Sequence, residues 1–288
     1  MMKRRSDSTV TPLQNVADTL TALIKVVLLS HPAGRIKAQK QEKPLIIMGN
    51  GPSLRETIDK HLDILCQNDT LAVNFAANSP EFFKIKPRYY TLADPLFFEN
   101  SDAENMISLY ENLNKVDWQM TLLVPVKAPV KISNPNINIK RFNMVGVDGA
   151  RWLKHLLFSS RMAMPRPRNV LIPSIMAAIW LGYKNIYLVG ADHSWMKSIS
   201  VDEENHVVSI QTHFYKDSNK ELGRKRDLFA NVRLHEVAHS YYTAFKAYHT
   251  ILDYITPKGI KIYNSTPESF IDAFERRNLS TLRTNNND

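Results

Sequence analysis

The chain has 288 residues, 44% of them apolar, and a formal net charge of +9. This length suits one large domain or a domain with an appendage, and the composition is that of an ordinary globular protein. The single cysteine, Cys66, excludes an intrachain disulfide framework and favours a reducing compartment. Since no long uninterrupted apolar run or signal peptide stands out, we expect a cytoplasmic protein.

The positive charge favours anionic partners such as nucleotides or an acidic membrane surface. It is divided among short patches, 3–5, 35–43, 161–168 and 220–226. The aromatic and glycine motifs of RNA-binding modules are missing, so we expect no nucleic-acid partner. Each patch is equally well interpreted as a solvated basic surface.

Residues 1–43 form an N-terminal segment whose sequence pattern differs from that of the rest of the chain. Its apolar residues recur at helical spacing: Ala17, Leu20, Leu23, Ile24, Val27 and Leu28. An amphipathic helix followed by the basic stretch 35–40 suits peripheral contact with an anionic membrane through residues 14–40. That contact would be with the inner face of the cytoplasmic membrane. Packing of the helix on the core or on a partner chain, as in a homo-oligomer, is an equal alternative.

From residue 44 the sequence alternates between apolar strand candidates and helical segments. We expect strands at 45–48, 70–74, 89–92, 121–124, 186–189 and 260–263. Helices are expected around 54–66, 102–114, 172–182 and 230–256. This alternation predicts an α/β, Rossmann-like fold: a mainly parallel sheet with helices on both faces. The catalytic domain would cover 44–275, with a polar lid at about 194–230 and a polar tail at 276–288.

The first predicted strand ends abruptly in the motif G-N-G-P-S. Gly49 and Gly51 indicate a close backbone approach or a positive φ angle. Ser53 stands where a helix N-cap belongs, with Glu56 completing a capping box. Such a turn can bind a phosphate at the helix N-terminus, or can be a capped turn without a ligand.

Polar residues also follow the later strand candidates. Asn74 ends the second strand, Asp94 follows the third, and Asp192 and His193 follow the strand at 186–189. Each could merely cap a turn. In a parallel sheet, however, these ends converge at one edge, where ligands of α/β proteins lie.

Several of these motifs together resemble the bacterial sialyltransferases of glycosyltransferase family 42. The motifs are G-N-G-P-S, the strand-end Asn74, D-P-L-F-F at 94–98, and the stretch from Pro173-Ser174 to Asp192. The chain is also similar to a wider group with the same nucleotide-binding core. That group includes flagellin-glycosylation proteins and hydroxymethylpterin pyrophosphokinases.

The resemblance implies transfer of sialic acid, or a related nonulosonic acid, from a CMP-sugar donor to a glycan acceptor hydroxyl. It implies that Asn50 and Asn74 contact the nucleotide and its phosphate, that Ser174 contacts the donor, and that Asp192 lies near the ribose. The loop residues Gly49, Gly51 and Ser53 would form the rest of the donor site. The family requires no metal, so we expect no metal ligands and no cofactor besides the donor substrate.

Two departures from the family pattern concern charge and the general base. Asp94 stands where the family has asparagine, and a carboxylate beside a phosphate favours a bridging Mg²⁺ or a sugar-hydroxyl role. The histidine that acts as the general base in the family corresponds to Asp217 in this chain. We therefore rank His213 first as base and Asp217 second, with His193 as a phosphate or sugar contact. Tyr215 either donates its phenol hydrogen to the leaving phosphate or packs as a lid aromatic.

Three alternative functions remain at this stage, and one of them is a non-catalytic scaffold that retained the nucleotide pocket. Asp94, as a Mg²⁺ ligand, would suit a pyrophosphokinase-like enzyme. The motif H-E-V-A-H at 235–239, on a predicted helix, has the two histidines and the glutamate of a zinc metalloprotease. The metalloprotease is disfavoured because no third histidine follows at metzincin spacing and the next glutamate, Glu268, lies beyond a predicted strand.

Overall fold

The computed structural model describes residues 11–99, 102–209 and 232–284. Its centre is a sheet of eight strands in the order β10-β9-β6-β1-β2-β3-β4-β5, and each adjacent pair is parallel. The strands are β1 (Leu45–Met48), β2 (Asp69–Val73), β3 (Tyr89–Thr91), β4 (Met120–Pro125), β5 (Ile137–Phe142), β6 (Asn185–Val189), β9 (Lys261–Asn264) and β10 (Glu275–Arg276). The predicted fold class is therefore confirmed.

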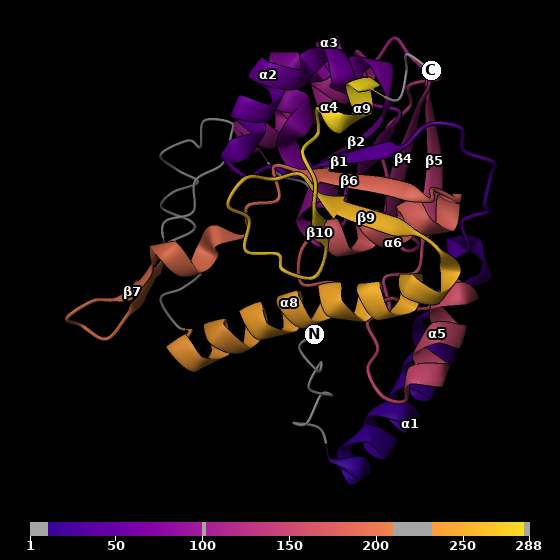
Figure 1. The fold of residues 1–288 in the computed structure, drawn as a ribbon, viewed down its shortest axis with the longest axis vertical. Helices are drawn as coiled ribbons and strands as arrows, with labels where there is room; N and C mark the ends of the chain where they lie inside the picture. The colour runs from indigo at the N-terminus through magenta and orange to yellow at the C-terminus, as the bar shows by residue number, and fades with distance from the viewer. Residues whose placement is uncertain (1–10, 100–101, 210–231, 285–288) are drawn as a thin grey trace.

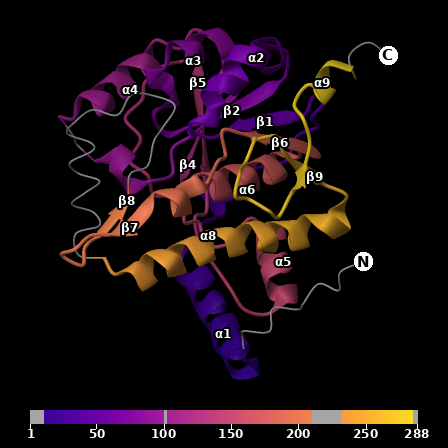
Figure 2. The ribbon, with the colours of Figure 1, turned by 60° about the vertical axis from the view of Figure 1, so that its left-hand side comes forward.

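Helices cover both faces of the sheet (Figures 1 and 2). One face carries α1 (Pro12–Leu29), α5 (Arg151–Ser159), α6 (Leu171–Leu181) and α8 (Leu234–Ile255). The other carries α2 (Ser53–Gln67), α3 (Pro80–Ile85), α4 (Glu104–Asn114) and the short α9 (Thr281–Thr284).

Strand β1 shows how the sequence fills both apolar layers. Leu45 and Ile47 pack in the cluster beneath α6 and α8, whereas Ile46 and Met48 pack in the cluster beneath α2. Because successive side chains of a strand point to opposite faces, a strand buried on both sides must be apolar throughout. This is why an unbroken apolar run identified β1.

The order of the strands creates a switch point beside β1. The chain moves outward from β1 through β2, β3 and β4 to β5, and then returns to place β6 on the other side of β1. The connections that leave β1 and β6 therefore diverge at the carboxyl edge of the sheet. Open α/β sheets bind ligands in the crevice that forms at such a point.

Some elements were not predicted. Strand β5 is the outer strand of the sheet and reads I-N-I-K-R-F, a half-exposed pattern weaker than that of the buried strands. The first part of the predicted lid contains the 3-10 helix η4 (Ser194–Ser198) and a hairpin, β7 (Ile199–Val201) and β8 (Val207–Ser209), which projects from the domain (Figure 1). The rest of the predicted lid, 210–231, lies outside the described residues.

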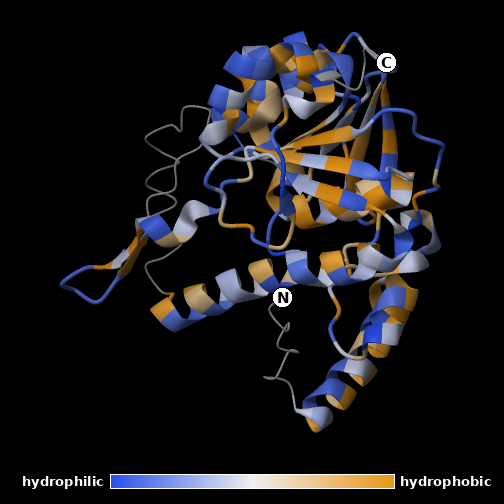
Figure 3. Cartoon of the chain, viewed as in Figure 1, coloured by the Kyte–Doolittle hydropathy of each residue, from blue (hydrophilic) through white to orange (hydrophobic). Residues whose placement is uncertain are grey.

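Helix α1 contacts the domain along a narrow face. Ala22 and Val26 are buried, and the Thr19 hydroxyl accepts a hydrogen bond from the Ala150 N–H at 2.8 Å. At the C-terminal end of α1, the Ser30 hydroxyl donates to the Met162 carbonyl. The rest of the helix surface is largely exposed and includes many apolar residues (Figure 3).

Candidate functional site

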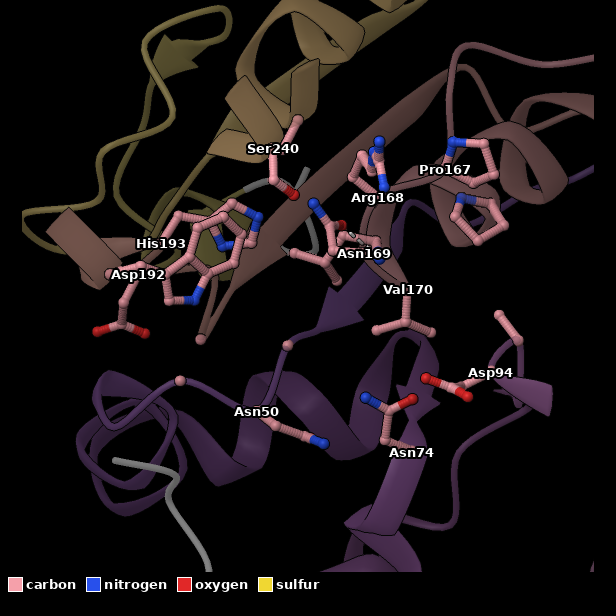
Figure 4. A pocket seen from close by; sticks show the side chains of 18 of the residues that line it. Asn50, Asn74, Asp94, Pro167, Arg168, Asn169, Val170, Asp192, His193 and Ser240 are labelled. Atoms are coloured by element: carbon pink, nitrogen blue, oxygen red, sulfur yellow. Dashed lines mark hydrogen bonds between the residues drawn. The ribbon is translucent and has the colours of Figure 1, made fainter. Parts of the chain in front are cut away.

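A cavity of about 750 Å³ opens at the switch point, where β1, β2, β3 and β6 end. Figure 4 shows Asn50, Asn74 and Asp94 at the strand ends on one side, with Arg168 and Asn169 facing them. Seven predicted site residues line the cavity: Gly49, Asn50, Gly51, Asn74, Asp94, Asp192 and His193. The expected convergence of the strand ends is confirmed as geometry, and the roles of these residues stay predictions.

The two glycines of the first turn are required by the neighbouring turn. A Cβ atom at Gly49 would lie 2.4 Å from the Gly190 carbonyl oxygen, and one at Gly51 would lie 1.9 Å from Asp192 Oδ2. Backbone hydrogen bonds from Gly49 N–H to Val189 and from Gly51 N–H to Gly190, each 2.8 Å, hold the two turns together. The glycines thus let the ends of β1 and β6 meet at the floor of the cavity.

Asp192 caps helix α2, and this corrects the capping box expected from the sequence. Asp192 accepts hydrogen bonds from the Ser53 N–H at 3.2 Å and from the Ser53 hydroxyl at 2.8 Å. Ser53 is the first helical residue and not the N-cap, while Glu56 pairs with Lys60 at 2.5 Å. Burial raises the pKa of Asp192, and the bonds from Ser53 partly oppose that rise. An anion from within the chain therefore already occupies this helix N-terminus.

Two amide side chains at the strand ends offer polar atoms to the cavity. The Asn50 Nδ2 donates to the Val73 carbonyl at 3.2 Å, whereas the buried Asn50 Oδ1 accepts no hydrogen bond from the described residues. Asn74 has a left-handed backbone with φ of 52°, and its carbonyl accepts a bond from the Tyr90 hydroxyl. A buried acceptor without a donor is costly, so Asn50 is prepared for a ligand that donates.

A third amide, Asn169, belongs to a network that includes His193. Asn169 Oδ1 accepts from the Leu171 N–H at 3.0 Å and from the Tyr248 hydroxyl at 3.1 Å, and Tyr248 contacts His193 Nε2 at 2.5 Å. Since the Tyr248 hydrogen goes to Asn169, His193 Nε2 carries the ring hydrogen and Nδ1 is the acceptor. Asn169 Nδ2 is buried and has no partner among the described residues, which leaves it to a ligand that accepts.

His193 is a neutral ring at physiological pH. Its imidazole stacks on Trp195 with ring centroids 4.1 Å apart, and burial lowers the pKa of His193 to about 3. A base this weak removes a proton poorly near pH 7. The ranking of His193 below His213 and Asp217 as the base stays a prediction.

The cavity also contains opposite charges. Arg168 and Lys197 line it, and Lys197 lies 3.6 Å from Glu268, whereas Arg168 makes no ion pair within the described part of the chain. Asp94 Oδ1 accepts a bond from the Leu96 N–H at 2.9 Å and begins the 3-10 helix η3 (Pro95–Phe98). Arg168 is therefore the cation best placed to neutralise an anionic ligand.

The remaining predicted site residues are not brought to the cavity by the described structure. Ser174 is buried in α6, where its hydroxyl donates to the Val170 carbonyl at 2.8 Å, and its neighbour Pro173 lines the cavity instead. His213, Tyr215 and Asp217 lie outside the described residues.

The H-E-V-A-H motif lies on the first turns of α8. His235 and His239 are exposed, while Glu236 accepts a hydrogen bond from the Arg233 N–H at 2.8 Å and so caps the helix. Among the described residues, the group of three side chains close enough to share a metal ion is elsewhere, on the β7–β8 hairpin: Asp202, Glu204 and His206. Glu236 thus caps α8. Among the described residues, no third side chain joins His235 and His239 to complete a zinc site.

Sequence reasoning missed the residues that reach the cavity from outside the strand ends. Arg168 stood in a basic patch that was equally well interpreted as solvated surface, and Ser240 and Tyr241 come from α8. Asn169 had a usable signal, because asparagine just before an apolar helix is typical of an N-terminal cap. No pattern in a single sequence indicates that α8 lies beside the ends of β1 and β6.

Comparison with solved structures gives a structural likeness to a glycosyltransferase. No protein-family model matches the chain, and no curated protein matches it. A solved structure, the MAf glycosyltransferase from Magnetospirillum magneticum AMB-1, has a TM-score of 0.47 and 13% sequence identity to this chain. The match covers 93% of this chain and 39% of that one, so the chain spans well under half of that protein's length.

Proposed function

We propose that this protein is a glycosyltransferase that uses a CMP-sugar, transferring sialic acid or a related nonulosonic acid to a hydroxyl of a glycan acceptor. The observation that carries the proposal is the switch-point cavity, in which Asn50, Asn169 and Arg168 present an acceptor, a donor and a cation without partners among the described residues. A nucleoside monophosphate needs all three kinds of contact. The motifs shared with family 42 sialyltransferases favour cytidine.

The chemistry places two demands on the site. The bond between the anomeric carbon and the phosphate oxygen breaks, CMP leaves with the electron pair, and an oxocarbenium-like transition state forms. The acceptor oxygen then bonds to the anomeric carbon, and its proton must go to a base. Arg168 would stabilise the negative charge that develops on the departing phosphate. The base would be His213 or, failing that, Asp217.

His193 would act through position and not through proton transfer. The hydrogen bond to Tyr248 fixes the ring, and Tyr248 in turn fixes the neighbouring Asn169, which also lines the cavity. A neutral imidazole at this place lets Nδ1 accept a hydrogen bond from a hydroxyl of the donor. Loss of the ring would therefore weaken donor binding and leave the identity of the base unchanged.

A pyrophosphokinase-like enzyme is a second candidate, and Asp94 is the residue that favours it. This carboxylate lines the cavity beside Asn74, where a bridging Mg²⁺ could join it to a phosphate. Such an enzyme would bind ATP in preference to CMP and would need the metal. The two candidates thus differ in both nucleotide and metal dependence.

The direct test is to incubate the purified full-length protein with CMP-sialic acid, with UDP-glucose, or with ATP and Mg²⁺, and to follow release of each nucleotide. The proposal expects release of CMP alone, and the same rate in excess EDTA. Arg168→Gln should abolish most of the release, whereas Lys37→Gln, which also removes an exposed cation, should retain it. ATP turnover that depends on Mg²⁺ would favour the pyrophosphokinase, and turnover of UDP-glucose alone would exclude the CMP donor.

A further inference from the structure

The largest collection of exposed apolar side chains in the described residues lies on α1 and α5, away from the cavity. Ten large apolar residues are exposed there: Leu13, Val16, Leu20, Leu23, Ile24, Val27, Leu28, Leu29, Trp152 and Leu156. We call these residues the apolar face. Contiguous apolar surfaces of this kind mark sites of interaction with a protein or a membrane.

Most of the apolar face lies on one side of α1. The residues 13, 16, 20, 23, 24 and 27 recur at helical spacing, and the buried Ala22 and Val26 lie on the opposite side of the helix. Leu20 is 57% exposed and Val27 is 79% exposed, although both are apolar. One side of α1 is thus packed against the domain, and the apolar side is exposed.

Helix α5 extends this face. Hydrogen bonds join α1 to the residues that flank α5, from Ala150 N–H before α5 to the Thr19 hydroxyl and from the Ser30 hydroxyl to the Met162 carbonyl after α5. Trp152 and Leu156, one turn apart on α5, are 67% and 58% exposed. Figures 1 and 2 both show the two helices together at one end of the molecule.

Charge complementarity identifies the occupant. The chain leaves α1 into a segment with three exposed cations, Arg35, Lys37 and Lys40, and none of them makes an ion pair with a described residue. In the sequence, Lys3, Arg4 and Arg5 precede the helix. Apolar residues with adjacent cations are the combination that binds anionic lipid surfaces.

Two other occupants fit less well. A helix from a second copy could pack on the seam formed by Leu13, Val16, Leu20, Leu23 and Val27, but the flanking Ala17 and Ile24 bear no charge to select a partner. By length and composition α1 could cross a membrane, but 18 residues span only about 27 Å and Ala22 and Val26 would have to leave the core.

We propose that the apolar face is a docking surface for an anionic membrane, on which α1 lies in the plane of the lipid headgroups with Trp152 and Leu156 beside it. The surface is independent of the cavity and does not rest on the proposed activity. It would hold the protein at the membrane surface.

The test is co-sedimentation of the full-length protein with vesicles of phosphatidylcholine, with or without about one third phosphatidylglycerol. Binding is expected to the anionic vesicles, and the double variant Leu20→Glu, Val27→Glu should lose it at least tenfold. Lys37→Gln and Lys40→Gln should each weaken it about fivefold. Ile107→Glu is the matched control, because this residue on α4 is 48% exposed but lies outside the apolar face.

Any of three outcomes would contradict the proposal that the apolar face docks on an anionic membrane. The double variant could bind vesicles as well as the wild type, or the wild type could resist extraction by alkaline carbonate as a spanning protein does. Sedimentation velocity could instead show a dimer that the double variant dissociates, with no vesicle binding by either. Nucleotide binding should be unchanged in all of these variants, so a failure here is distinguishable from a failure of the proposed function.

Discussion

The burial of His193 predicts a specific loss of stability in mild acid. The pKa of this ring is about 3 in the folded protein and about 6.5 in the unfolded chain. Because the folded pKa is the lower one, the unfolded chain binds a proton below pH 6.5 and the folded protein does not. The stabilisation is therefore present above pH 6.5 and is lost as the pH falls toward 3.

The magnitude follows from the two pKa values. Between pH 8 and pH 5, protonation of His193 in the unfolded chain lowers the free energy of unfolding by about 2 kcal/mol. As the pH falls to 3 and below, this loss approaches about 5 kcal/mol. The first value is a substantial part of the stability of a typical domain. Other groups also titrate over this range, so the contribution of His193 must be measured as a difference between variants.

Urea denaturation at pH 8 and at pH 5 measures this difference. In His193→Gln the fall in the free energy of unfolding between the two pH values should be smaller by about 2 kcal/mol than in the wild type. His249→Gln is the control, because His249 lies on α8 but is exposed, and its surface pair with Asp272 is worth only a few tenths of a kcal/mol. Equal falls in His193→Gln and the wild type would refute the buried, neutral ring.

Three further predictions concern the turns, the metal and the base. Gly51→Ala should lower the free energy of unfolding by about 1 to 3 kcal/mol, because its Cβ would lie 1.9 Å from Asp192 Oδ2. Chemical denaturation should show a smaller loss when Asp192 is already replaced by alanine, and equal losses in the two backgrounds would contradict the contact. If Asp94 contacts a sugar hydroxyl, transfer from the CMP-sugar should continue in excess EDTA, whereas a requirement for Mg²⁺ would favour the pyrophosphokinase. His213→Ala should abolish transfer to the acceptor while the protein still binds the donor; measured beside Asp217→Ala, wild-type transfer in the former and none in the latter would reverse the ranking of the base.

The sequence predicted the sheet well because the strands near its centre are buried on both faces. An unbroken apolar run such as 45–48 has few other interpretations, and polar residues just beyond it must lie at the sheet edge. The edge strand β5 escaped detection because its exposed side carries Asn138 and Lys140, so its pattern is weaker. The β7–β8 hairpin has strands of only three residues joined by a polar turn, and it was expected only as an irregular lid.

The site was predicted in part, for a similar reason. Asn50 and Asp192 were found because they follow strands, but a contact between Asp192 and Ser53 joins residues 139 positions apart and leaves no local pattern. The capping box was wrong because Asp192 took the place that Ser53 would have filled. Arg168 is indistinguishable in sequence from other surface cations, since only the fold brings it to the switch point.

The central claim is that the switch-point cavity holds the CMP portion of a sugar donor, and isothermal titration calorimetry with CMP tests it most directly. The wild type should bind CMP more tightly than UMP or AMP. Arg168→Gln should weaken CMP binding about tenfold or more, because a charged contact to the phosphate is lost, and Asn50→Ala should weaken it about fivefold or more while the far-UV circular dichroism is unchanged. Lys37→Gln should bind as the wild type does. Absence of CMP binding, or an affinity that neither Arg168→Gln nor Asn50→Ala alters, would contradict the account.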